Sequence, residues 1–205
     1  MGIVITPRQE QIINSTLLGD GHLWRGNAGN YQLRANCGDK DKSYIFWKYK
    51  ELSSVNLFPN SPKRGINNWG KVYWYLHSRR DPYFTELHKL YYPNEEKVVP
   101  LVTLNKLEDL GLAVLYQDDG NFHYRHLPWV DPLPRVRLHT ESFTKEDNYL
   151  ISDWIYKRWG LRFRVVPSYG SKWRLSLGTK EGVREFMEIV RPFVVPCMSR
   201  KLGVK

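Results

Sequence analysis

Apolar and polar residues alternate along several short segments of the chain. Residues 32–37 read Gln-Leu-Arg-Ala-Asn-Cys, and the same alternation continues in residues 71–78, 135–139 and 172–178. Successive side chains of a strand point to opposite faces, so this pattern is typical of antiparallel sheets with one face on a core. We predict a hairpin over residues 21–37 and another over 120–140, each followed later in the chain by a second pair of strands.

Four segments between these strands have the spacing of amphipathic helices. They are residues 42–53 and 83–91 in the first half, and residues 145–159 and 180–190 in the second. A further helix precedes each hairpin. Thr6-Pro7 is typical of an N-cap followed by proline at the first helical position, and this helix should end near Gly19. Asn105, with Glu108 three residues later, predicts the start of a helix that ends near Asp118.

The order of predicted elements is the same in both halves of the chain. Each half has a helix, two strands, a helix, two strands and a helix, which predicts an α+β protein built from two αββαββα repeats. Asp119 stands 99 residues after Asp20, and both residues precede a glycine. Each half closes on a proline-flanked lysine, Lys97 or Lys201. We predict a first repeat over residues 1–97, a linker over 98–104 and a second repeat over 105–205.

Composition narrows the class of partner and of compartment. The net charge of +10 and the pI of about 9.6 favour a polyanionic partner, while the 41% hydrophobic content excludes disorder. Cys37 and Cys197 form neither a metal-ligand spacing nor a disulfide framework. No apolar run approaches the roughly 20 residues of a membrane span, and the N-terminus lacks a secretory pattern. We expect an intracellular protein with no membrane partner; organellar, bacterial and phage origins all stay open.

The polar faces of the predicted strands carry mainly cations, amides and tyrosines, with Glu141 as the acidic exception. Cations at every second position suit phosphate contacts, and Arg, Asn and Gln side chains hydrogen-bond to base edges in the major groove. A half-exposed sheet alternates in any protein, so it is the basic character that indicates nucleic acid. The residues expected to contact DNA are His22, Trp24, Gln32, Arg34, Asn36, Lys71, Tyr73, Tyr75, His77, Asn121, His123, Arg125, Arg135, Arg137, His139, Arg162, Arg164, Lys172 and Arg174.

Each of the two Asp-Gly steps places a carboxylate at the C-terminal end of an apolar helix. That position is electrostatically unfavourable because the helix dipole is already negative there, and a divalent cation would relieve the cost. The glycine after each aspartate predicts a helix stop in the left-handed conformation. One such step is an ordinary helix end, whereas two copies in a repeated basic-sheet unit indicate a shared site.

The paired motif resembles that of the LAGLIDADG homing endonuclease family, of the two-motif, single-chain type. The first copy is Ile13 to Gly21, INSTLLGDG, and the second is Leu112 to Gly120, LAVLYQDDG. The segments LHTESFTKED (138–147) and RPFVVPCMSRKL (191–202) are similar to the second half of such enzymes, so the resemblance runs from about residue 10 onward.

The resemblance implies a fold, an activity and a site. The two motif helices would pack at a pseudo-twofold axis, between two antiparallel DNA-binding sheets that form a saddle. Asp20 and Asp119 would bind catalytic Mg²⁺, and Gly19 and Asp118 would add mainly backbone oxygens. Lys97 and Lys201 would act around the hydrolytic water. Two or three Mg²⁺ ions are implied; Mn²⁺ is expected to substitute, and Ca²⁺ to bind without cleavage.

The function expected from these observations is Mg²⁺-dependent, site-specific hydrolysis of both strands of a long double-stranded DNA target. Metal ions activate water, neutralise the phosphate and assist the leaving oxygen, and Mg²⁺ takes few protein carboxylates beside substrate phosphates. We expect a monomer, because two motifs in one chain satisfy the interface. Two alternatives stay open: a maturase that binds intron RNA for splicing, and a catalytically inactive DNA-binding protein of the same fold.

Overall fold

The fold was analysed in a computed structural model that describes residues 4–27, 29–54, 56–127 and 130–203, without the side chains of 125–132. The first half has a helix, two strands, a second helix, two more strands and a third helix. These elements, with one short 3-10 helix, are α1 (Pro7–Leu18), β1 (His22–Trp24), β2 (Gln32–Gly38), η1 (Asp39–Asp41), α2 (Lys42–Leu52), β3 (Lys63–Ile66), β4 (Val72–His77) and α3 (Pro82–Tyr91). A short helix, α4 (Leu101–Leu104), leads to the second half.

The second half repeats this order, so the predicted succession of helices and strands is confirmed. It consists of α5 (Asp109–Asp119), β5 (Gly120–Leu127), β6 (Val130–Leu138), α6 (Lys145–Trp159), β7 (Arg164–Pro167), β8 (Trp173–Leu177) and α7 (Lys180–Val190), followed by the 3-10 helices η2 (Arg191–Phe193) and η3 (Pro196–Leu202). None of the helices found in the described residues is long and apolar enough to cross a bilayer.

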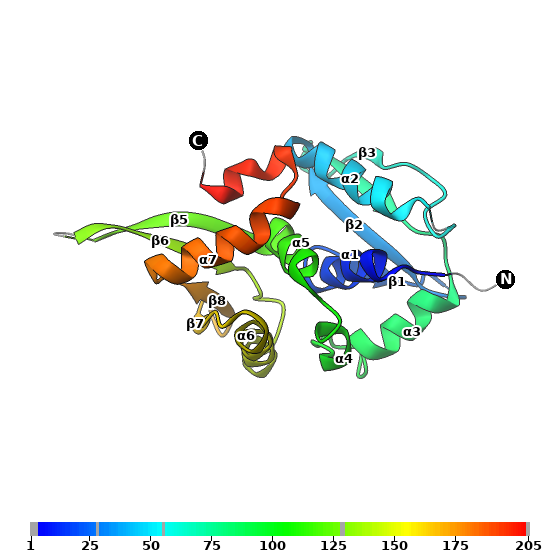
Figure 1. The fold of residues 1–205 in the computed structure, drawn as a ribbon. Helices are drawn as coiled ribbons and strands as arrows, with labels where there is room; N and C mark the ends of the chain where they lie inside the picture. Colours follow the sequence, from blue (N-terminus) through cyan, green and yellow to red (C-terminus); the bar gives the residue numbers. More distant parts are fainter. Residues whose placement is uncertain (1–3, 28, 55, 128–129, 204–205) are drawn as a thin grey trace.

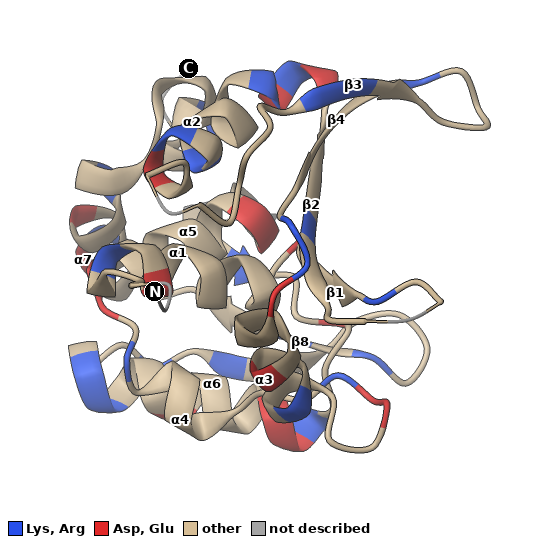
Figure 2. Cartoon of the chain, turned by 90° about the vertical axis from the view of Figure 1, so that its right-hand side faces the viewer, with Lys and Arg blue, Asp and Glu red and all other residues tan. Residues whose placement is uncertain are grey.

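Two four-stranded antiparallel sheets face the same side of the molecule, and the helices cover their other side (Figures 1 and 2). The strand order is β1-β2-β4-β3 in one sheet and β5-β6-β8-β7 in the other, so the two sheets have the same topology. The predicted α+β fold with two antiparallel sheets is therefore confirmed. One hydrophobic core of buried residues runs through both halves, and α1 and α5 lie side by side at its centre (Figure 1).

The predicted N-cap of α1 is confirmed, whereas the predicted start of α5 is wrong. Thr6 caps α1 through a reciprocal capping box with Gln9. Asn105 instead ends α4, and α5 begins four residues later, after Glu108. The reason is a cap from the other half, because the side-chain oxygen of Gln11 accepts hydrogen bonds of 3.1 Å from the backbone of both Glu108 and Gly111. A tertiary acceptor thus replaces the local one.

The glycines of the two motifs correct a second prediction, since neither Gly21 nor Gly120 has a positive φ. Gly120 is extended and directly begins β5. A Cβ at Gly120 would lie 2.3 Å from the carbonyl oxygen of Tyr116, and one at Gly21 would lie 2.6 Å from that of Thr16. Glycine is therefore required by close approach of the backbone to the last helical turn, and not by a left-handed conformation.

Candidate active site and nucleic-acid interface

The ends of α1 and α5 bring the two predicted aspartates close together. Asp119 is the last residue of α5, and Asp20 follows α1 by two residues. Burial, and then the negative charge of Asp118, raise the pKa of Asp20 to about 6. Burial, and then the charges of Asp20 and Asp118, raise the pKa of Asp119 to about 8. Burial, together with repulsion between the three neighbouring carboxylates, therefore opposes full ionisation of this acidic centre.

The two predicted lysines each bind the end of the motif helix from their own half. Lys97 Nζ donates to the carbonyl oxygens of Gly19 and Gly21, both at 3.4 Å. Lys201 Nζ donates to the carbonyl oxygens of Gln117 at 2.5 Å and Asp118 at 3.1 Å. A cation at a helix C-terminus satisfies the last carbonyl groups and offsets the dipole. Burial lowers the pKa of both ammonium groups, and both lie beside the acidic centre.

Asp118 occupies the same centre, but its carboxylate is not directed to solvent. Lys48 Nζ lies 2.8 Å from each carboxylate oxygen of Asp118, and the Tyr44 hydroxyl donates to one of them at 2.7 Å. The side chains of Lys48 and Asp118 are 4% and 0% exposed. Sequence reasoning missed Lys48 and Tyr44. The one available signal was that Lys48 stands among the apolar residues of an amphipathic helix, where a lysine is unexpected. With its carboxylate occupied, Asp118 presents its backbone oxygen, like Gly19.

The donor set fits a hard divalent cation that takes most of its ligands from elsewhere. Among the described residues, no three His, Cys, Asp or Glu side chains form a metal-binding group. Two aspartates with raised pKa values and nearby backbone oxygens are nevertheless the kind of oxygen donors that Mg²⁺ uses together with water and phosphate. A carbonyl oxygen has two lone pairs, so the lysine contacts to Gly19 and Asp118 leave one acceptor position on each.

The first sheet presents aligned rows of polar residues on its outer face. His22, Arg34 and His77 stand side by side across three strands, and Asn36 is paired with Tyr75. The Arg34 guanidinium stacks on Trp24, 3.6 Å from the ring centroid. The predicted face is completed by Gln32 and Tyr73 on the strands and by Lys71 in the hairpin turn before β4.

Sequence reasoning also missed Lys63, which is exposed on β3 and paired with Tyr75. The short KRGI strand did not stand out from its surroundings in the sequence. Burial and then the charge of Arg34 lower the pKa of His77 to about 4. This histidine is therefore neutral at pH 7, in an environment that already disfavours further positive charge.

The second sheet repeats this arrangement with more arginines. Asn121, Arg137, Ser176 and Arg164 form one row across all four strands, and His123 is paired with Arg135. Burial, then Arg137 and Arg135, lower the pKa of His123. Figure 2 shows lysine and arginine along the strands and hairpins of both sheets. Both outer faces are thus basic, as complementarity to a polyanion requires.

Some predicted contact residues have protein partners at the edge of this face. Glu141 lies 3.3 Å from His139 and 3.8 Å from Arg174. Arg162 stacks on Tyr156 of α6, with 4.0 Å to the ring centroid. Lys172 is exposed in the turn between β7 and β8, and the side chain of Arg125 lies outside the described residues.

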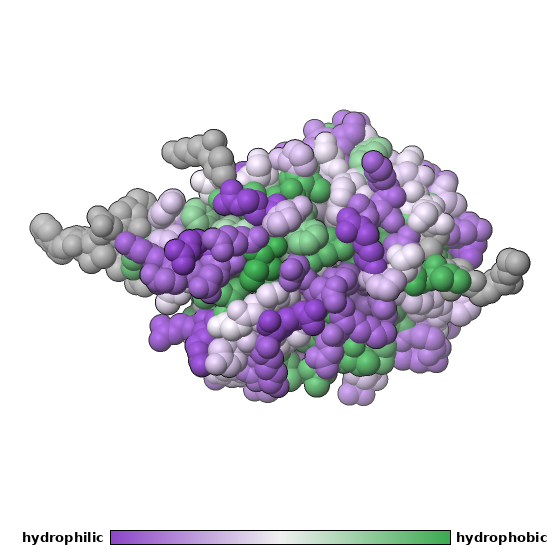
Figure 3. Space-filling view, viewed as in Figure 1, coloured by the Kyte–Doolittle hydropathy of each residue, from purple (hydrophilic) through white to green (hydrophobic). Residues whose placement is uncertain are grey.

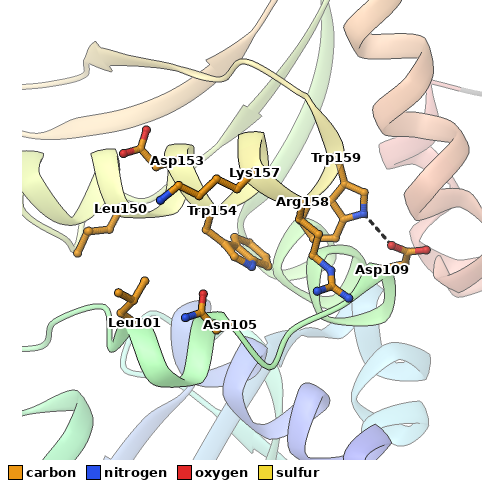
Figure 4. A pocket seen from close by; sticks show the side chains of 9 residues that line it. All are labelled: Leu101, Asn105, Asp109, Leu150, Asp153, Trp154, Lys157, Arg158 and Trp159. Atoms are coloured by element: carbon orange, nitrogen blue, oxygen red, sulfur yellow. Dashed lines mark hydrogen bonds between the residues drawn. The ribbon is translucent and has the colours of Figure 1, made fainter.

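A larger hollow of about 660 Å³ lies away from the aspartates, between α4, α6 and the start of α5. Figure 4 shows the indole of Trp154 inside it, beside Trp159, whose Nε1 donates to Asp109 at 2.7 Å. Patches of hydrophobic residues lie among hydrophilic ones on this face of the molecule (Figure 3). The hollow contains none of the residues predicted to bind metal or DNA, so size alone does not mark the site.

Two repeats that share one acidic centre, between two basic antiparallel sheets, define a single-chain nucleic-acid protein with two pseudo-equivalent halves. The chain matches the model of the LAGLIDADG DNA endonuclease family over residues 10–184, and it belongs to this family.

Two relatives share modest identity with this chain over nearly all of its length. DNA endonuclease I-ChuI of Chlamydomonas applanata is 26% identical over 216 residues, which cover 97% of this chain and 96% of I-ChuI. Protein RecA of Mycobacterium gastri is 24% identical over 210 residues, 97% of this chain. The chain spans about half the length of that protein, 48%.

Solved structures have the same fold. The homing endonuclease I-WcaI, bound to its DNA recognition sequence, has a TM-score of 0.82 at 18% identity, covering 97% of this chain and 87% of its own. I-SmaMI, bound to an uncleaved DNA target in the presence of calcium ions, has a TM-score of 0.60 at 6% identity, covering 96% and 88%. These likenesses establish the two-sheet architecture.

Proposed function

We propose that this chain is a site-specific homing endonuclease that hydrolyses both strands of a long double-stranded DNA target. The observation that carries the proposal is the position of Asp20 and Asp119, which lie together at the ends of two packed helices, Asp20 exposed and Asp119 half-buried, with a basic sheet on each side. Family membership and the DNA-bound relatives support the same activity. The proposed roles of the individual residues follow from geometry and charge.

The basic faces bind the duplex, and the acidic centre acts on its backbone. Rows such as Asn121–Arg137 and Asn36–Tyr75 offer donors and acceptors toward base edges, while the surrounding lysines and arginines contact phosphates. The other predicted residues that lie in the strands and turns of the two sheets contribute to the same contacts. Because the contacts are spread over two sheets, the protein recognises a long DNA site through many individually weak contacts.

Asp20 and Asp119 would hold divalent cations through their carboxylates, and Gly19 and Asp118 through backbone oxygens. Mg²⁺, when bound, supplies an activated water and neutralises charge on the phosphate. We propose two or three such ions, with Mn²⁺ as a substitute and Ca²⁺ as an ion that supports binding without cleavage. Lys97 and Lys201 bind carbonyl groups at the two helix ends, and we propose that their ammonium groups act on the hydrolytic water and the reacting phosphate.

We propose that the chain is divided as its sequence pattern predicts, into a first repeat at 1–97, a linker at 98–104 and a second repeat at 105–205. The first sheet and second sheet are each formed within one repeat. The α1–α5 contact is already made within a single chain, so a monomer carries the complete site. Sedimentation at micromolar concentration without DNA should give a mass near 24.3 kDa.

Strand-resolved cleavage tests the proposal. The first substrate is a plasmid in which the genomic sequences that flank this gene are joined directly, without the intervening element that carries the gene. The second is a library of random duplex sites. We expect Mg²⁺-dependent nicking and then linearisation at one site, and binding without cleavage in Ca²⁺. A protein that binds this duplex and cleaves neither strand in Mg²⁺ or Mn²⁺ would support the inactive DNA-binding alternative. Preference for the intron RNA over the duplex would support a maturase.

A further inference from the structure

One charged pair lies wholly inside the molecule and joins the two repeats. Lys48 belongs to α2 of the first repeat, and Asp118 belongs to α5 of the second. Their charged groups are 2.8 Å apart, and 4% and 0% of the two side chains are exposed. The Tyr44 hydroxyl also contacts the Val114 carbonyl oxygen at 3.4 Å. These three side chains, Tyr44, Lys48 and Asp118, are called the cross-repeat cluster below.

A buried ion pair is an inefficient way to stabilise a fold. Removing two charges from water is costly, and apolar replacements of such pairs are often neutral or stabilising. The position of the pair suggests a different role. Lys48, Asp118 and Lys201 border a small cavity of about 80 Å³ together with Asp20. Asp119 does not border this cavity, so the cross-repeat cluster supports one side of the acidic centre.

The pair has no counterpart at the equivalent positions of the other repeat. The motif residue that matches Asp118 in the first repeat is Gly19. The seventh residue of α2 is Lys48, whereas the seventh residue of α6 is Ile151, which is fully buried. The charged pair therefore exists on one side of the pseudo-twofold axis and is replaced by glycine and isoleucine on the other.

The surrounding contacts fix the orientation of Asp118. A Cβ at Gly19 would lie 2.6 Å from the Cβ of Asp118, so the aspartate packs directly against the end of the first motif. Its carboxylate is held by Lys48 and Tyr44, while its backbone oxygen accepts from Lys201 at 3.1 Å. Lys48 has both carboxylate oxygens of Asp118 within hydrogen-bond distance, so its contact with the site is made through Asp118, and its charge also favours the ionised form of Asp20.

We propose that Lys48 is a positioning residue for DNA cleavage, which fixes the end of α5 against α2 and thereby sets the Asp20 side of the active site. This inference rests on the proposed endonuclease function. Because the cross-repeat cluster supports one side only, its loss should affect the two strand cleavages unequally. A displacement of about 1 Å at a reacting group costs up to about a hundredfold in rate.

The test measures single-turnover nicking of each strand separately, with DNA affinity in Ca²⁺ and thermal unfolding as independent readouts. Lys48→Met should lower the melting temperature, since it leaves Asp118 buried without its cation. It should lower the nicking rate of one DNA strand about 10–100-fold and affect the nicking rate of the other strand several-fold less. DNA affinity should stay near the wild-type value. Lys50→Met is the matched control, because it removes the same charge from an exposed position of the same helix.

The double variant Lys48→Met/Asp118→Asn keeps the result interpretable if the single variant unfolds. It removes both charges, so its melting temperature should recover toward wild type. A positioning role predicts that nicking of the sensitive strand stays slow in this stable variant and that Lys48→Arg restores part of the rate. Recovery of both strands together with stability would overturn the proposal and leave Lys48 a structural residue. A wild-type protein that binds but cleaves neither strand would instead contradict the endonuclease function itself.

Discussion

Gln11 of α1 accepts a hydrogen bond from the backbone N–H of Glu108, at the start of α5 and 97 residues later in the chain. Its side-chain oxygen also accepts from Gly111, at 3.1 Å. Glu108 is the N-cap residue of α5 but makes no side-chain cap, and a residue of the first motif helix supplies the capping acceptor instead. Beside it, a Cβ at Gly111 would lie 3.1 Å from the Ser15 hydroxyl, which shows how closely the two helices approach.

Replacing this cross-repeat cap should destabilise the protein. Gln11→Ala leaves two helix N–H groups without their acceptor and should lower the free energy of unfolding by about 1–2 kcal/mol, the usual cost of a lost N-cap. Urea unfolding followed by circular dichroism measures the effect. The Gln11 amide also donates to the Glu108 carboxylate at 3.4 Å, so the control is Gln11→Glu/Glu108→Gln, which retains the acceptor oxygen without opposing two carboxylates. Equal stability of Gln11→Ala and wild type would show that the cap contributes nothing.

The two aspartates should be needed for cleavage and dispensable for binding. Asp20→Asn and Asp119→Asn preserve shape but remove a charge that a hard cation requires, so either change should nearly abolish double-strand cleavage in Mg²⁺. DNA affinity should be largely retained, because binding is spread over many cations of the two sheets whereas cleavage depends on a few oxygens. Gel shifts in Ca²⁺ and cleavage in Mg²⁺ separate the two effects. Cleavage at the wild-type rate by both variants would refute the shared site.

The pH dependence of stability should reveal the crowded carboxylates. Asp119 has a pKa of about 8 in the folded protein, against about 3.9 for an unperturbed aspartate. The folded state therefore binds more protons between these two values, so stability should fall as pH rises from about 4 through 8. Melting temperatures in EDTA should decrease over this window. Adding Ca²⁺ should reduce the decrease if the carboxylates bind the ion.

Asp119→Asn isolates this contribution from other titrating groups. The variant should melt at a higher temperature than wild type at pH 8.5 and show a flatter pH profile. Asp153→Asn, at an exposed site on α6, is the matched control and should follow the wild-type curve. Parallel curves for Asp119→Asn and wild type would mean that the carboxylate is not destabilised by its surroundings.

DNA binding should depend on the arginines of both sheets. Arg34, Arg137 and Arg174 lie on the outer faces, and truncating each to Ala should weaken affinity. A base-reading arginine should cost about 1–3 kcal/mol and relax specificity at one position, whereas a phosphate contact should weaken all sequences and flatten the salt dependence. Fluorescence anisotropy at several salt concentrations distinguishes these cases. Unchanged affinity of the triple variant for long duplex DNA would contradict the basic-sheet interface.

Sequence patterns predicted the elements well because local rules decide them. Alternation placed strands such as β4, and apolar spacing placed α6 at residues 145–159, where the structure has it. The two failures have different physical causes. The start of α5 follows from a contact with Gln11, 97 residues earlier in the chain. The need for Gly120 is local, because the extended backbone after α5 brings this residue against Tyr116 of the last helical turn.

The candidate site was predictable where its residues are repeated in the sequence, and not where they depend on a contact between the two repeats. Asp20, Asp119, Lys97 and Lys201 are recognisable because each is duplicated at matching positions of the two repeats, and the structure brings all four together. The catalytic role of each is still a proposal. Lys48 has no duplicate and belongs to no motif, so only the folded chain reveals its partner in the other repeat.

The unlike ends of the two motifs also determine which halves can be combined. Gly19 leaves space that the side chain of Asp118 fills, and an added Cβ there would come within 2.6 Å of it. Two copies of the second half would oppose one Asp118 to another, with no glycine between them and no Lys48 to neutralise either. For protein engineering, the two halves are therefore not interchangeable. A new first half can replace the one in this chain if it has a glycine at the position of Gly19 and a lysine at the position of Lys48.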